Sequence, residues 1–139
     1  MKKYSLPPKL RGEIEYHLEH YYTYLREIKA AERDMLPSNT PKYSADPAGH
    51  AEAHRTTEDV AIKILSDRYI AKTAERIIAI EHILGRLSKE DFRLVELAFL
   101  RGTHTIAGAG LELNMSQRTA YRHVDAILTE LARELGLIP

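Results

Sequence analysis

Side chains that can read the edges of DNA bases gather in one short stretch near the C-terminus. The candidates, spaced so that one side of a helix can carry them, are Gln117, Arg118, Thr119, Tyr121 and Arg122. Arginine can bond a guanine edge through two parallel donors, glutamine can do the same to adenine, and a tyrosine ring can contact a thymine methyl group. No acidic residue lies between Glu112 and Asp125 to oppose a polyanion. The chemistry indicated is recognition of duplex DNA, in which one bidentate pair discriminates between bases by about 1–3 kcal/mol.

Two hydroxyl residues beside this stretch are suited to bind phosphate. Thr105 and Ser116 each precede a helical pattern, where a side-chain oxygen caps the helix and the backbone amides point outward. Phosphate contacts of this kind fix the register of a protein on the duplex but carry no sequence information. We therefore expect Thr105 and Ser116 to position the chain on DNA rather than to read bases.

A helix, a sharp turn and a second helix are needed to present these side chains. Thr105 predicts the start of a short helix, Ile106–Leu113, which ends at Asn114. Ser116 predicts the start of a second helix at Gln117. This rhythm is typical of a helix-turn-helix, whose second helix enters the major groove.

Two positions meet the steric demands of such a motif. Gly110 supplies the very small residue required where two helices cross closely, and Asn114 tolerates a left-handed backbone in the turn. Against this, a glycine inside a helix costs about 1 kcal/mol relative to alanine, so Gly108 and Gly110 disfavour the first helix. The small core between the helices is predicted to contain Leu113, Met115, Ala120 and Val124.

The N-terminal part of the chain predicts one long helix followed by a linker. Apolar residues recur every three or four positions from Lys9 to Met35, which indicates a continuous amphipathic helix. Residues 37–49 then contain three prolines and a glycine, which disfavour helix. We expect a linker at about 37–55.

A second long helix and a shorter third one follow. The pattern from Thr56 to Asp59 resembles a capping box and opens a helix that can run to about Arg86. About 28 residues of helix would extend about 42 Å, too far to be buried against the short C-terminal unit alone. Its expected partner is the first helix, in an antiparallel hairpin, or the same hairpin of another subunit. Ser88 repeats the capping signal for a third helix, which Gly102 is expected to end.

The expected fold is therefore all-α. Residues 1–86 are assigned to a long N-terminal helical hairpin with an oligomerisation role, and residues 87–139 to a C-terminal helix-turn-helix DNA-binding domain. Lysine plus arginine and aspartate plus glutamate both total 20 of 139 residues, so the bulk attraction to DNA is near zero. A monomer should then bind weakly, which favours a homo-oligomer that holds two recognition helices together.

Composition also bears on the cellular compartment. The chain contains no cysteine, which excludes disulfides, a thiolate nucleophile and cysteine-ligated zinc, and fits a reducing environment. Prolines and charges follow the basic N-terminus where a signal peptide would need an apolar run, and no 18-residue uncharged stretch occurs. A cytoplasmic protein acting at the nucleoid, with no membrane partner, is expected.

Metal binding and catalysis are functions of a different class from DNA binding, and the sequence offers little support for either. His50 and His54 have the spacing i, i+4, and His17 and His20 the spacing i, i+3, both of which suit ligands on a helix. No third ligand is identifiable, so solvated histidines are favoured over a metal site. The sequence has no Gly-x-Ser-x-Gly motif, phosphate-binding glycine loop or paired-acid pattern. We expect a protein that is not an enzyme and has no cofactor or small-molecule substrate.

The stretch from Thr105 to Leu135, with its core Asn-Met-Ser-Gln-Arg-Thr-Ala-Tyr-Arg, resembles region four of sigma factors. It is more similar still to the C-terminal part of the RinA-like phage transcriptional activators. The likeness continues in Ser44–Gly49, Leu87–Glu90 and Glu134–Leu137. It implies a phage or prophage regulator that binds upstream of a late-gene promoter. As a separate expectation, the bound protein presents a surface to host RNA polymerase.

The chain departs from the pattern of these activators in two places. Arg101–His104 replaces a more basic linker, and His123 occupies a position where a bulkier apolar residue is usual. The second departure puts the packing beneath the recognition helix in question.

Two alternatives remain open at this point. A small terminase subunit for phage DNA packaging also joins a helix-turn-helix to a helical oligomerisation hairpin, although such subunits usually carry the DNA-binding unit first. A helical interaction module that contacts RNA polymerase or another regulator without touching DNA would need no recognition helix. Salt-sensitive binding to DNA would separate that module from the other two.

Overall fold

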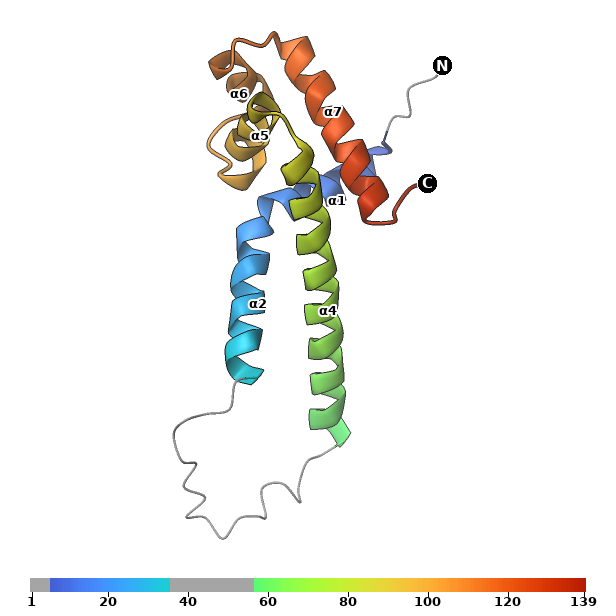
Figure 1. The fold of residues 1–139 in the computed structure, drawn as a ribbon. Coiled ribbons are helices and arrows are strands. Elements are labelled where there is room, and N and C mark those ends of the chain that lie inside the picture. The colour runs from blue at the N-terminus through green and yellow to red at the C-terminus, as the bar shows by residue number, and fades with distance from the viewer. Residues whose placement is uncertain (1–5, 36–56) are drawn as a thin grey trace.

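The computed structural model describes residues 6–35 and 57–139, and every regular element in these ranges is a helix. This confirms the predicted all-α fold. The elements are α1 (Pro8–Glu19), α2 (Tyr21–Met35), α4 (Thr57–Arg86), α5 (Lys89–Val95), the π-helical segment η1 (Glu96–Leu100), α6 (Ile106–Glu112) and α7 (Gln117–Glu134). Figure 1 shows α2 and α4 side by side in a stalk, which extends from a head made of the remaining elements and the C-terminal end of α4.

The predicted linker at 37–55, the cap at Thr56 and the Ser44–Gly49 stretch lie outside the described residues. Within the described part, α4 ends at Arg86 as predicted. No helix there is both long enough and apolar enough to cross a membrane.

The prediction of one helix from Lys9 to Met35 is wrong, because the chain breaks at His20. His20 has φ −100° and ψ 10°, and it separates α1 from α2. Its ring stacks on the ring of Tyr16 at a centroid distance of 3.8 Å, and its Nδ1 lies 2.8 Å from the carbonyl oxygen of Tyr16. The carbonyl oxygen of Tyr16 also keeps the backbone bond from the amide of His20 at 3.0 Å. The helix axis changes direction at His20, so α1 crosses the base of the head while α2 follows α4 (Figure 1).

Polar contacts tie the two stalk helices together. The hydroxyl of Tyr21 donates to Glu81 at 2.8 Å, and the hydroxyl of Tyr69 donates to Glu27 at 2.9 Å. The guanidinium of Arg76 lies 5.8 Å from the centre of the Tyr24 ring, within range of a cation–π interaction. These contacts hold α2 against α4 where few apolar side chains are fully buried.

The main hydrophobic core lies in the head. Apolar side chains from α1, α4, α5, η1 and α7 interlock there, and α1 packs against both η1 and α7. Fully buried members include Ile14, Leu18, Ile80, Leu94, Val95, Val124, Leu128 and Leu131. The break at His20 is therefore compensated by the burial of two large side chains of α1.

The third predicted helix begins and ends where the sequence indicates but contains an unpredicted π-helical turn. The hydroxyl oxygen of Ser88 accepts a hydrogen bond from the amide of Asp91 at 3.2 Å, and Gly102 adopts φ +64°. Between them, the Arg101 amide bonds the Glu96 carbonyl at 2.8 Å, a spacing of five residues. Leu97 lies within this wider turn and is buried in the core.

Acidification is expected to destabilise the fold through His17, which is buried with its Nδ1 2.7 Å from the hydroxyl of Tyr24. Burial, and then the positive charge of Arg76, lower the pKa of His17 below its ordinary value of 6.5. Because the unfolded chain takes up a proton that the folded chain resists, the free energy of unfolding should fall as pH drops below about 6.5, down to the folded pKa.

Urea unfolding of the wild type and His17→Gln at several pH values tests this. The free energy of unfolding of the variant should fall less steeply on acidification than that of the wild type. His82, His104 and His123, which face carboxylates, are present in both proteins and so do not affect the comparison. Identical pH profiles for the two proteins would contradict this role of His17.

Candidate nucleic-acid interface

Side-chain caps fix the starts of α6 and α7. The Thr105 hydroxyl oxygen accepts from the amide of Gly108 at 3.0 Å, and the Ser116 hydroxyl oxygen accepts from the amide of Thr119 at 3.1 Å. Ser116 also donates its hydroxyl proton to the side-chain oxygen of Thr119 at 2.9 Å. Both predicted phosphate-binding residues therefore stand at helix starts, where free backbone amides are also available to an anion.

The turn between the helices has the predicted backbone. Asn114 adopts φ 58°, the left-handed conformation that asparagine tolerates better than most residues. The amide of Met115 then bonds the carbonyl of Gly110 at 2.8 Å, which closes the turn. Leu113 and Met115 are partly buried against the core, next to the fully buried Ala120.

The crossing of α6 over α7 leaves no space for a side chain at Gly110. A Cβ atom built there would lie 2.6 Å from the Cβ of Ala120, a separation that real Cβ atoms do not show. A Cβ at Gly108 would lie 3.2 Å from the Thr105 side-chain oxygen, which is tight but less severe. The glycine that weakens α6 as an isolated helix is therefore required by its contact with α7.

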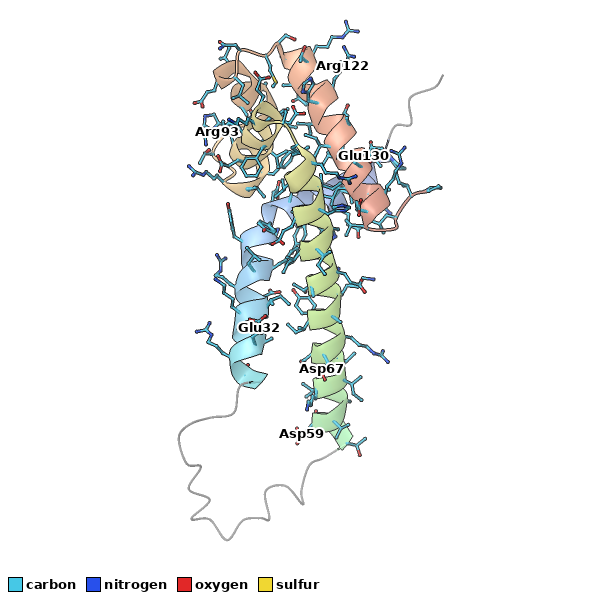
Figure 2. All side chains as sticks on the ribbon, in the orientation of Figure 1. Glu32, Asp59, Asp67, Arg93, Arg122 and Glu130 are labelled. Atoms are coloured by element: carbon cyan, nitrogen blue, oxygen red, sulfur yellow. The ribbon has the colours of Figure 1, made fainter. Side chains whose placement is uncertain are left out.

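The side chains predicted to read bases lie on the outer side of α7. We define the recognition edge as Gln117, Arg118, Tyr121 and Arg122, all of which are exposed. Thr119 is half-buried at the border of this edge, and its hydroxyl oxygen accepts a hydrogen bond from Ser116. Figure 2 shows Arg122 near the end of the head that is remote from the stalk. Neither Arg118 nor Arg122 forms an ion pair with another described residue, so both guanidinium groups are available to a partner.

An arginine of α1 balances the negative charge of an acidic side chain next to the recognition edge. Asp125, one turn after Arg122, pairs with the guanidinium of Arg11, which is 114 residues away in the sequence. The same guanidinium bonds Glu15 at 3.0 Å. Arg11 is a contributor that the sequence did not predict, because no local pattern links α1 to α7.

His123 makes a polar contact in place of the expected apolar packing. Its Nδ1 lies 2.6 Å from a carboxylate oxygen of Asp91, which joins α7 to the start of α5. Both residues line an open hollow of about 610 Å³ between α4, α5 and α7, next to Arg122. The departure at His123 thus replaces apolar packing with a hydrogen bond at the edge of the head.

The linker Arg101–His104 is less basic in effect than its composition suggests. Arg101 lies 3.9 Å from a carboxylate oxygen of Glu96, and the Nε2 of His104 lies 2.8 Å from Glu112. These contacts dock the linker on η1 and α6. The recognition edge is therefore the better cationic surface for a polyanion.

The histidine pairs do not form a metal site in the described part of the chain. The expectation of a solvated histidine is wrong for His17, which is buried and faces the hydroxyl of Tyr24. The ring of His20 faces the backbone of Tyr16 instead, so the two rings bond different groups. Residues 6–35 and 57–139 contain no group of three carboxylates or imidazoles placed to hold an ion. His50 and His54 lie outside the described residues.

Comparison with known proteins gave no match. No protein-family model, curated protein sequence or solved structure matched the chain. The likeness to RinA-like activators and to sigma region four stays a prediction, and the geometry of the site is the basis for a function.

Gly110→Ala is expected to lower the free energy of unfolding by about 1–3 kcal/mol, since the added methyl group overpacks the helix crossing. Urea unfolding measures this loss. Ala120→Gly should restore part of it in the double variant, because it removes the atom against which the new methyl group would press.

Gly12→Ala serves as the matched control. Gly12 is also helical, but a Cβ there would meet nothing within 4 Å. This change should stabilise α1 by up to about 1 kcal/mol. Equal effects of Gly110→Ala and Gly12→Ala would show that the crossing is not as tight as described.

Proposed function

We propose that this chain is a sequence-specific DNA-binding transcriptional regulator, with a phage or prophage late-gene activator as the specific form. The observation that carries the proposal is the exposed recognition edge on α7, whose two arginines have no ion-pair partner in the described part of the chain. The proposed activity is binding, and it needs no catalytic group or cofactor.

In the proposed complex, the N-terminal turns of α7 enter the major groove. Arg118 and Arg122 are four residues apart and therefore project from the same side of the helix toward base edges. Gln117 and Tyr121 flank them, and each offers a different base contact. Thr105 and the free amides at the helix starts bond backbone phosphates and set the register. Ser116 joins them in the complex by turning its hydroxyl proton from Thr119 to a phosphate oxygen.

Arg11 has an electrostatic role in the same complex. Without its positive charge, Asp125 would present an uncompensated carboxylate one turn from Arg122 and would repel the phosphate backbone. Since the whole chain has equal numbers of acidic and basic side chains, such local compensation decides which surface attracts DNA.

The resemblance to RinA-like activators suggests the compartment, partners and oligomeric state of the proposed regulator. A bacterial cytoplasm, host RNA polymerase as a second partner and a homo-oligomer on DNA fit a late-gene activator. A packaging subunit would use the same recognition edge, whereas an interaction module would leave it unused. Binding to DNA therefore tests the proposal against that module first.

Selection of bound duplexes from a random pool is expected to return a preferred sequence. On that sequence, Arg118→Ala and Arg122→Ala should each weaken binding by about 1–3 kcal/mol, because each removes a base contact. Fluorescence anisotropy measures the affinity, and circular dichroism should show unchanged helix content.

Arg133→Ala is the matched control, since Arg133 is exposed on the same helix but pairs with Glu130 near its other end. It should leave the affinity unchanged. If no sequence is enriched, the proposed function is wrong. If a sequence is enriched but Arg118→Ala and Arg122→Ala bind it as the wild type does, the recognition edge is wrongly assigned.

Arg11→Ala is expected to weaken DNA binding by up to about 1 kcal/mol, because Asp125 loses its exposed ion-pair partner. Asp125→Asn in the Arg11→Ala background should recover the affinity, since it removes the repulsive charge. Loss of affinity that persists in the double variant would instead assign Arg11 a direct contact or a purely structural role.

A further inference from the structure

The N-terminal half of α4 is exposed on all sides although it is rich in apolar side chains. Residues 57–69 are all exposed, and the large apolar ones among them are 46% to 64% exposed. They are Val60, Ile62, Ile64, Leu65 and Tyr69. A helical stretch of this length is marginal in water without packing, and clustered exposed apolar side chains mark an interaction surface.

One side of this half-helix has the spacing of a helix contact. We define the Leu65 face as Glu58, Ala61, Ile62, Leu65, Tyr69 and Lys72, which recur at intervals of one, three and four residues along one side of α4. A shallow hollow of about 380 Å³ lies on this side of the helix. It is lined by Ile62, Leu65, Ser66, Tyr69 and Ile70. The bond from the Tyr69 hydroxyl to Glu27 holds this ring in place against α2.

The charges at the two ends of the Leu65 face are complementary to each other. Glu58 lies seven residues before Leu65 and Lys72 seven residues after it, so each is two helical turns from the centre. Neither has an ion-pair partner within the residues that the structure describes. A second copy in the antiparallel direction would set Glu58 against Lys72 of the partner subunit, and a parallel copy would set like charges together.

The same antiparallel register matches the sizes of the side chains. Leu65 would meet Leu65 of the partner subunit at the two-fold axis, and the small Ala61 would lie opposite the large Tyr69 of the partner subunit. Self-pairing of this kind, in which one patch serves both subunits, is the usual basis of a two-fold dimer.

The opposite side of α4 is less suited to a second copy. It carries Val60, Ile64 and Ile78, of which Ile78 is 67% exposed. Asp67 stands in the middle of this strip, so self-pairing would bring two carboxylates into an apolar contact. The members of the Leu65 face carry charge only at its two ends. Arg68, which borders this face, would lie opposite the apolar Ile62 of the partner subunit and not opposite a like charge.

We propose that the Leu65 face binds the Leu65 face of a second copy of this chain, with the two α4 helices antiparallel. The role of this dimer rests on the proposed function: it would hold two recognition helices at a fixed spacing on DNA. In this dimer the Arg86 end of each α4 would lie 21 residues from the two-fold axis at Leu65. At 1.5 Å per residue, the two Arg86 ends would be about 60 Å apart. Half-sites about two turns of DNA apart would suit that span better than adjacent ones.

Sedimentation equilibrium of the full chain without DNA tests the dimer. We expect a monomer–dimer equilibrium for the wild type and a dissociation constant at least about 100-fold higher for Leu65→Glu, which sets two carboxylates together at the axis. Ile78→Glu is the matched control, as it adds the same charge on the other side of α4 and should dimerise normally. Leu65 and Ile78 are 64% and 67% exposed, so both variants should keep the helix content of the wild type.

A charge exchange tests the direction of pairing. Glu58→Lys and Lys72→Glu should each raise the dissociation constant about 2- to 10-fold, as expected for two exposed pairs per dimer. The double variant should return it toward the wild-type value, because opposite charges face each other again.

A wild type that stays monomeric at high concentration would overturn the proposal. So would a dimer lost through Ile78→Glu but kept by Leu65→Glu, or a double variant no better than the single ones. Because DNA is absent, a dimer that binds no duplex would refute the proposed function alone, and a monomer that binds a preferred sequence would refute the dimer alone.

Discussion

The close approach of α6 and α7 is the constraint on which the recognition surface depends. At Gly110 the two helices come so near that one methyl group would collide with Ala120. This distance fixes the turn at Asn114 and, through it, the direction in which the first turns of α7 project. A wider crossing would change the tilt of α7 against α6, and with it the direction in which Arg118 and Arg122 both project.

Contacts from distant parts of the chain hold that edge in position and tune its charge. The break at His20 turns α1 across the head, so that Ile14 and Leu18 enter the core and Arg11 reaches Asp125. On the other side of α7, His123 bonds Asp91 at the start of α5. The two polar contacts steady α7 without using either arginine of the recognition edge.

Local signals were enough to predict the caps and the turn. Thr105, Ser116, Gly110 and Asn114 act on neighbours within a few residues, or through a steric rule that a single residue type reveals. The break at His20 was missed because the apolar repeat continues across it, and only the different partners of α1 and α2 in space reveal two helices. Arg11 could not be predicted, since its partner is 114 residues away.

Attaching a DNA-cleaving iron chelate to single cysteines tests the placement of α7 in DNA most directly, because the chain has no cysteine of its own. The probe at Gln117→Cys should cut a selected duplex at a defined position, since this residue begins α7 at the proposed groove. The same probe at Glu130→Cys, on the C-terminal part of α7, should cut weakly. Equal cutting from both positions, or none from Gln117→Cys on DNA that the chain still binds, would contradict the account.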